Sequence, residues 1–159
     1  MVSQRVGLGY DIHRLAVGRR LVLGGVAIEH PAGLVGHSDG DVLLHAVMDA
    51  VLGATGLGDL GSHFPSDDPS YAGADSAGLL RQIGSKVREA GYTVVSLDAT
   101  IVAEAPRLAP HLAEMRERVA RGLGVATEGV SVKAKTNDGV GPIGAGDAIA
   151  ALAVVLATK

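Results

Sequence analysis

Segments with the apolar pattern of β-strands alternate along this sequence with segments that have the apolar pattern of α-helices. The strand segments are rich in β-branched residues, and a Gly-Gly pair inside one of them is typical of a hairpin. Strands are predicted for residues 5–12, 92–104 and 129–136, and a hairpin of two short strands for residues 20–30. This mixture predicts the α+β class, with a mixed β-sheet, helices packed on one face of it and a small β-hairpin.

Three further segments place apolar residues at the spacing of one helix face. They predict helices over residues 39–54, 75–90 and 110–122, with Ser38 as the N-cap of the first. Residues 148–158 form a continuous apolar run, which fits either a buried strand or a buried helix. The tight glycine turn before this run favours a strand that returns beside its predecessor.

The chain has 159 residues, enough for a single domain over residues 1–159 with a sizeable core. With one Phe, three Tyr and no Trp, the core must be aliphatic, and the chain lacks aromatic platforms for single-stranded nucleic acid. The net charge of −3 also argues against a nucleic-acid partner. No stretch approaches the ~20 apolar residues of a membrane-spanning helix, and the N-terminus does not resemble a signal peptide. We therefore expect a cytoplasmic protein without membrane contact.

Two polar, glycine-rich segments interrupt the predicted elements, at residues 56–76 and 137–147. The first is nearly free of aliphatic residues and is predicted to be a loop. A loop of that length in a compact domain is usually functional.

The absence of cysteine restricts any metal site to nitrogen and oxygen ligands. Asp11 and His13 are two residues apart in a predicted strand, so their side chains project from the same face. His45, on the first predicted helix, is the candidate third ligand. One carboxylate and two imidazoles with an open fourth position are the ligand set of a catalytic zinc site. Asp41 and Asp49 lie one helical turn from His45 on either side, and either could hold its second ring N–H.

Two segments suggest phosphate binding. His37 and Ser38 precede a predicted helix, whose free N–H groups and dipole favour bound anions. Thr136 and Asp138 follow Lys135 at the end of a predicted strand, and an acid beside a hydroxyl suits Mg²⁺ held together with phosphate oxygens.

Simpler interpretations of these motifs stay open. Asp11 could end a strand while His45 is a hydrogen-bonded, half-buried histidine, and Ser38 could be an ordinary helix cap. The segment 133–138 could be a polar strand end with a turn. Residues 101–111 could read a flat base edge with main-chain groups, or simply connect a strand to a helix.

Five segments in order along the chain resemble one known family, the 2-C-methyl-D-erythritol 2,4-cyclodiphosphate synthases. They are "GYDIHR", "GHSDGDVLLHAVMDAVLGA", "GDLGSHFPSDDPSYAGADS", "TIVAEAPRLAPH" and "KAKTND". The resemblance covers nearly the whole chain with family-like spacings, and its first two segments are the most specific.

The resemblance implies an enzyme of the non-mevalonate route to isoprenoid precursors, a lyase that transfers a phosphoryl group within its substrate. The substrate is 4-diphosphocytidyl-2-C-methyl-D-erythritol 2-phosphate, and the products are the 2,4-cyclodiphosphate and CMP. It also implies a homotrimer with active sites between neighbouring subunits, whose partners are the other copies and the small cytidine diphosphate substrate.

The resemblance implies a role for each matching position. Asp11, His13 and His45 would hold Zn²⁺ or another divalent cation, and Asp138 would hold a second ion, Mg²⁺ or Mn²⁺, with the diphosphate. His37 and Thr136 would stabilise the transition state. The implied substrate-binding residues are Ser38, Asp59, Leu60, Gly61, Phe64, Pro65, Ser66, Asp67, Asp68, Ala103, Glu104, Ala105, Pro106, Arg107, Leu108, Ala109, Lys135 and Asn137.

Some positions differ from the family pattern. Asp138 stands in place of a glutamate and Ser66 in place of a frequent aspartate, while Pro142 and Ala145 replace a Phe and an Arg common near the trimer axis. Two other functions remain as alternatives. One is a metal-dependent phosphohydrolase that uses the same ligands to activate water. The other is a non-catalytic trimer that binds an isoprenoid ligand on its axis, against which Ala145 argues.

Overall fold

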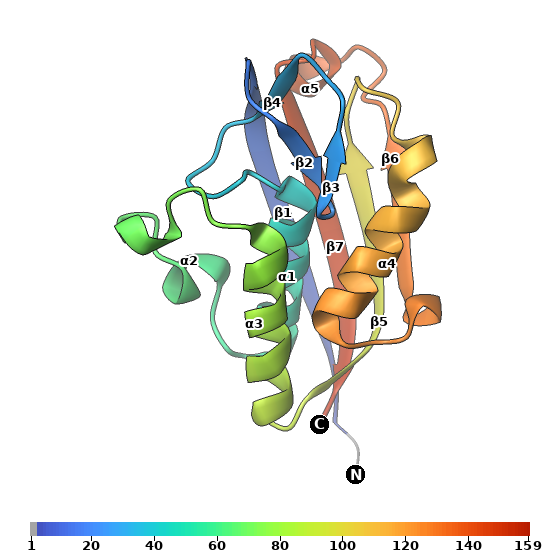
Figure 1. Ribbon diagram of the computed structural model, residues 1–159. Coiled ribbons are helices and arrows are strands. Elements are labelled where there is room, and N and C mark those ends of the chain that lie inside the picture. The colour runs from blue at the N-terminus through green and yellow to red at the C-terminus, as the bar shows by residue number, and fades with distance from the viewer. Residues whose placement is uncertain (1–2) are drawn as a thin grey trace.

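The computed structural model describes residues 3–159, which form a five-stranded sheet with helices against one face (Figure 1). The order across the sheet is β4-β1-β7-β5-β6, and β5 and β6 form its parallel pair. The strands are β1 (Gln4–Val17), β4 (Ala32–Leu34), β5 (Thr93–Val102), β6 (Val130–Lys135) and β7 (Ala148–Thr158), with β2 (Leu21–Leu23) and β3 (Val26–Ile28) as a separate hairpin. The predicted α+β class, mixed sheet and small hairpin are confirmed.

Three long helices cover one face of the sheet: α1 (Val42–Thr55), α3 (Ser76–Glu89) and α4 (Leu112–Leu123). Each begins and ends within a few residues of its predicted bounds. Among residues 3–159, no helix combines the length and the apolar character needed to cross a bilayer. The connections contain the short helices α2 (Leu60–His63) and α5 (Gly141–Gly144) and the 3-10 turns η1 (Pro69–Tyr71), η2 (Ala109–His111) and η3 (Thr127–Gly129).

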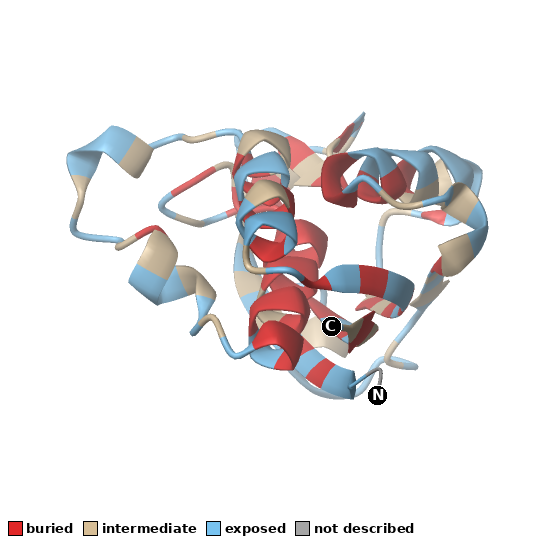
Figure 2. Cartoon of the chain, turned by 90° about the horizontal axis from the view of Figure 1, so that it is seen from below, coloured by how far each residue is buried: buried red, intermediate tan, exposed pale blue. Residues whose placement is uncertain are grey.

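Helix α1 lies against β1 and β7 on one side and against α3 on the other. Most of its residues are consequently buried, whereas α3 and α4 expose their outer faces (Figure 2). The buried side chains of the sheet, the helices and the hairpin form one continuous core.

The position of β7 differs from the prediction. The strand pairs with β1 and β5, and not with its predecessor β6. The glycine-rich connection includes α5 and carries the chain across β5 to the centre of the sheet. A glycine turn indicates a local reversal, but the choice of neighbour follows from burial, and β7 is apolar enough to be buried on much of both faces.

Helix α1 approaches β1 so closely that only glycine fits between them. A Cβ atom on Gly7 would lie 1.9 Å from the carbonyl oxygen of Ala50, and one on Gly9 would lie 1.9 Å from that of Ala46. Because side chains alternate along a strand, Gly7, Gly9, Asp11 and His13 all face the helix. The glycines therefore bring α1 down onto the strand that carries the two polar residues.

The opposite face of β1 is apolar and uncovered. Val6, Leu8 and Tyr10 are 70%, 67% and 54% exposed, and they alternate with residues that face α1. Leu152 and Val154 extend this apolar area onto β7. A sheet face of this kind is typical of a surface that another protein chain covers.

Candidate active site

Asp11 and His13 project together from β1, as their spacing predicts. The Nε2 atom of His13 lies 2.8 Å from Oδ2 of Asp11. Residues 11 and 13 pair with Ala151 and Ile149 of the central strand β7, so the backbone beneath the pair is fixed on that side.

Helix α1 brings His45 to the same point. Its Nδ1 atom lies 2.8 Å from Oδ2 of Asp11 and 3.3 Å from Nε2 of His13. The three side chains thus offer one carboxylate oxygen and two ring nitrogens, all within 4.8 Å of one another. Although 32 residues separate the two histidines, the close packing of α1 on Gly7 and Gly9 makes them neighbours.

The outer ring nitrogens define where the protons of the two imidazoles lie. Nδ1 of His13 donates to the carbonyl oxygen of Val35 at 2.6 Å, which leaves its Nε2 as a lone pair. Nε2 of His45 lies 3.0 Å from Oγ of Ser38 and 3.1 Å from Oγ of Ser76. A proton on that nitrogen leaves Nδ1 of His45 as a lone pair as well. In neutral rings of these tautomers two lone pairs and a carboxylate face each other, whereas a ring that gains a proton donates a hydrogen bond to Asp11.

The predicted partners of His45 are wrong, because other groups occupy both carboxylates. Asp41 is the N-cap of α1, accepts from the backbone N–H of Leu44 and also accepts from Gly24 and Gly25 of the hairpin. Asp49 accepts from the backbone N–H of Leu60 at 2.7 Å. The hydroxyls of Ser38 and Ser76 take the role that the sequence assigned to these acids.

The prediction that Ser38 caps α1 is wrong, and the start of the helix is not free to bind an anion. Ser38 is not the cap, and the carboxylate of Asp41, which is fully buried, occupies the helix N-terminus instead. Burial raises the pKa of Asp41 to about 6, against the opposing effect of its three N–H donors. At neutral pH the end of the helix therefore already carries a negative charge.

The electrostatics of the Asp-His-His cluster favour a bound cation. Burial raises the pKa of Asp11, but the hydrogen bonds and charges of His13 and His45 outweigh it and hold that pKa well below its ordinary value. The hydrogen bond to Asp11 raises the pKa of His13, although burial acts in the opposite direction. A permanent carboxylate next to two basic nitrogens needs a positive charge, which either a proton or a metal ion can supply.

The spacing of the two ring nitrogens fits a tetrahedral metal ion. Bonds of about 2.0–2.1 Å from zinc to nitrogen place neighbouring ligand atoms about 3.3 Å apart. The two ring nitrogens are 3.3 Å apart, whereas Oδ2 of Asp11 lies closer, at 2.8 Å from each of them. Each histidine also holds its outer nitrogen against an oxygen of the protein, as metal-bound histidines usually do.

A cavity of about 320 Å³ opens over the cluster. Of the predicted site residues, it is lined by Asp11, His13, His37, Ser38, His45, Leu60, Gly61, Phe64 and Ser66. His37 donates from Nε2 to the carbonyl oxygen of Asp68 at 3.1 Å, which ties it to the loop after α2. The predicted loop of residues 56–76 therefore forms one wall of this cavity.

Four predicted residues of that loop do not line the cavity. Asp59 caps α2 by accepting from Ser62, and Asp68 caps η1 by accepting from Ser70. Pro65 and Asp67 lie beside them, in the connection between α2 and η1. These residues shape the wall of the cavity in this structure and do not face into it.

The remaining predicted residues gather around a second cavity of about 300 Å³, at the ends of β5 and β6. It is lined by Ala103, Glu104, Pro106, Arg107, Leu108, Ala109, Lys135 and Thr136, among others, with Ala105 inside this loop. The hydroxyl of Thr136 donates to Asp138 at 3.1 Å, and the backbone N–H of Asn137 donates to Glu104 at 3.3 Å. The two cavities share no lining residue, and β7 lies between the strands that carry them.

Asp49, which the sequence places on the same face of α1 as His45, also lines the first cavity. The sequence did not reveal Tyr71 and Leu79, which line it too, or Ser76, which contacts His45 from the start of α3. Nothing local in the sequence connects Ser76 to His45, because 31 residues separate them.

Comparison with known proteins gives a consistent result. A curated relative from Bordetella avium, named 2-C-methyl-D-erythritol 2,4-cyclodiphosphate synthase, is 54% identical over 98% of this chain and 96% of its own length. The solved structure of bifunctional IspDF from Campylobacter jejuni matches with a TM-score of 0.95 and 37% identity over 100% of this chain, which spans 43% of that longer protein. IspF of Plasmodium falciparum, solved as a CDP complex, matches with a TM-score of 0.85 and 32% identity over 98% of this chain and 96% of that one.

The sequence model of one family, described as the YgbB family, matches residues 4–158. This range includes both cavities, the Asp-His-His cluster and the whole sheet. Together with the relative that shares more than half of its residues, the match shows that the chain belongs to the YgbB family.

Proposed function

We propose that this chain closes 4-diphosphocytidyl-2-C-methyl-D-erythritol 2-phosphate into 2-C-methyl-D-erythritol 2,4-cyclodiphosphate and CMP. The observation that carries the proposal is the convergence of Asp11, His13 and His45 beneath a cavity of about 320 Å³. The chain is an enzyme of this family, since a relative at 54% identity over nearly its full length has the name of that synthase. The reaction belongs to the formation of isoprenoid precursors.

The reaction needs placement and charge neutralisation more than covalent help from the protein. An oxygen of the 2-phosphate attacks the β-phosphorus, the bond from that phosphorus to the bridging oxygen breaks, and CMP leaves with the bridging oxygen. A divalent ion held by Asp11, His13 and His45, zinc in our proposal, would draw negative charge from the diphosphate oxygens. The imidazole of His37 and the hydroxyl of Ser38 lie on the wall of the same cavity, where they can hold phosphate oxygens.

We propose that the second cavity binds the cytidine end of the substrate of a neighbouring subunit. Residues of the segment 103–109 line this cavity and would offer main-chain groups to a flat base. Thr136 would contact the diphosphate, and Asp138 would hold Mg²⁺ or Mn²⁺ with it. IspF of Plasmodium falciparum, which shares this fold, was solved as a complex with CDP.

The separation of the two cavities supports a homotrimer with sites between subunits. In one chain, β7 separates β1 from β5, and two strand spacings amount to about 10 Å. The apolar face formed by Val6, Leu8 and Tyr10 with its continuation on β7 is a suitable contact surface for further copies. Each copy would then present its first cavity to the second cavity of its neighbour, and residues 1–159 would act as one synthase domain.

The direct test is incubation of the protein with the cytidylyl substrate, Zn²⁺ and Mg²⁺, followed by ³¹P NMR and chromatography of nucleotides. We expect equal amounts of CMP and a cyclic diphosphate, with no inorganic phosphate. Inorganic phosphate in place of the cyclic product would favour the alternative phosphohydrolase. If neither product forms although the protein is folded and metal-loaded, the proposed function is wrong.

The raised pKa of His13 predicts that metal binding weakens in mild acid. The hydrogen bond to Asp11 lets His13 keep its proton above the ordinary pKa of 6.5, and this proton must leave before the metal binds. With one proton displaced, the zinc affinity should fall about tenfold per pH unit once the pH is below that raised pKa. Chelator competition between pH 8 and 5.5, corrected for the chelator's own protonation, measures the slope. An affinity that stays constant over this range would contradict the ligand assignment.

A further inference from the structure

The side of His45 that faces away from Asp11 meets a buried pair of hydroxyls. Ser76 is fully buried and Ser38 is 9% exposed. Their Oγ atoms lie 3.1 Å and 3.0 Å from Nε2 of His45. Ser76 does not line the cavity, and the family resemblance implies no role for it. Its hydroxyl is shielded from solvent behind the histidine.

The hydrogen bond from Ser76 to Asp39 determines which group is the donor between Ser76 and His45. Its hydroxyl donates to Oδ1 of Asp39 in a short hydrogen bond, so its only proton is already used. Toward His45 the Ser76 oxygen can therefore act only as an acceptor. The Nε2 atom of His45 must donate to it, and this tautomer leaves the Nδ1 lone pair pointing at Asp11 and His13.

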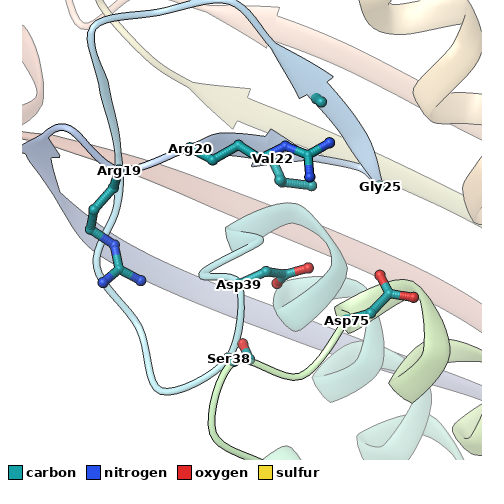
Figure 3. A pocket seen from close by; sticks show the side chains of 9 residues that line it. Arg19, Arg20, Val22, Gly25, Ser38, Asp39 and Asp75 are labelled. Atoms are coloured by element: carbon teal, nitrogen blue, oxygen red, sulfur yellow. The ribbon is translucent and has the colours of Figure 1, made fainter.

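Asp39 is held in place as firmly as the serine. Its Oδ2 accepts from the backbone N–H of Ser76 at 3.0 Å, and its Oδ1 accepts from the backbone N–H of Asp41 at 3.1 Å. The carboxylate thereby joins the first residue of α3 to the cap of α1. Figure 3 shows Asp39 next to Ser38 at the edge of another cavity, which Arg19 and Arg20 line from the hairpin side.

We infer that Ser76 and Asp39 are positioning residues that prepare His45 to bind the metal. The inference rests on the proposed metal role of His45. The Asp39–Ser76 pair fixes the imidazole in one tautomer and one orientation, and the negative carboxylate behind the serine makes the ring a stronger electron donor. Ser38 contacts the same nitrogen, but its hydroxyl has no carboxylate behind it and lies in the cavity wall, so it cannot replace Ser76 in both respects.

The first experiment measures zinc affinity of Ser76→Ala by chelator competition and records the visible spectrum of the Co²⁺-loaded protein. We expect binding that is weaker by about 10- to 100-fold, as for other partners of metal-bound histidines, together with a changed Co²⁺ spectrum. Ser85→Ala is the matched control, because Ser85 lies on the same helix and bonds only to Arg88 in this structure. Thermal unfolding of the metal-free proteins separates a loss of helix stability from a loss of metal affinity.

A second variant tests whether Asp39 acts on His45 through Ser76. Its result does not depend on whether Ser76→Ala folds. Asp39→Asn removes the charge behind Ser76 and should weaken zinc binding by about tenfold. In the Ser76→Ala background the same change should have an effect below about twofold, because Asp39 acts through the serine. Independent, additive effects would overturn the inference, as would zinc affinities equal to that of the unmodified protein. If the unmodified protein binds no zinc at all, the metal role in the proposed function fails instead.

Discussion

Replacing His45 by alanine is expected to abolish stoichiometric zinc binding and to reduce turnover by about 10³-fold or more. The variant retains only Asp11 and His13, and two ligands do not hold zinc in a catalytic site. Charge stabilisation by a bound ion contributes several kcal/mol to reactions of this type, which corresponds to a rate factor of about this size. Metal analysis after dialysis and the rate of CMP release give the two readouts.

His30→Ala is a suitable control for this substitution. His30 is half-buried, but its ring bonds to the carbonyl oxygen of Ala32 and contacts none of the three proposed ligands. It should retain the metal and most of the activity. Zinc content unchanged by His45→Ala would show that the cluster does not hold the metal.

The second large effect is expected for Gly9→Ala, a change of one methyl group. The new Cβ would lie 1.9 Å from the carbonyl oxygen of Ala46, so α1 has to move away from β1. Overpacking at rigid backbone typically costs 1–3 kcal/mol, and we expect about 3 kcal/mol or more because neither element can rotate away. The shift also separates His45 from Asp11. We therefore expect both the zinc affinity and the free energy of unfolding to decrease.

Gly53→Ala tests whether the loss comes from the close contact and not from the type of substitution. Gly53 lies in α1, and nothing is within 4 Å of its added Cβ. Alanine there should stabilise the protein by about 0.5–1 kcal/mol through helix propensity. Urea unfolding of the two variants gives both free energies. A Gly9→Ala protein as stable as the parent would mean that the helix does not depend on this glycine contact.

The sequence was sufficient for the elements and for part of the site. Apolar periodicity identified α1, α3 and α4, and the alternation along β1 placed Asp11 and His13 on one face. The same alternation also aligns Gly7 and Gly9 with them, and this detail explains how His45 reaches the pair. Periodicity describes one element at a time, so it could not show which helix lies on which strand.

The errors arose where distant segments meet. The helical spacing predicts that Asp41 is a partner of His45. In the structure the carboxylate of Asp41 instead accepts hydrogen bonds from backbone N–H groups between β2 and β3. The contact of Ser76 with His45 cannot be predicted from the sequence, because it depends on how α3 packs against α1. Likewise, a turn rich in glycine could not reveal that β7 crosses to the centre of the sheet.

The capping carboxylate of Asp41 has one more consequence. Many proteins that handle phosphates use the permanent positive field of a helix start, which is always present and needs no supply. In this protein the buried carboxylate of Asp41, which belongs to the chain itself, permanently occupies the positive end of helix α1. In the proposed reaction, side chains and bound divalent ions would balance the charge of the phosphate groups instead of this helix end, so turnover is expected to depend on the concentration of free divalent cations.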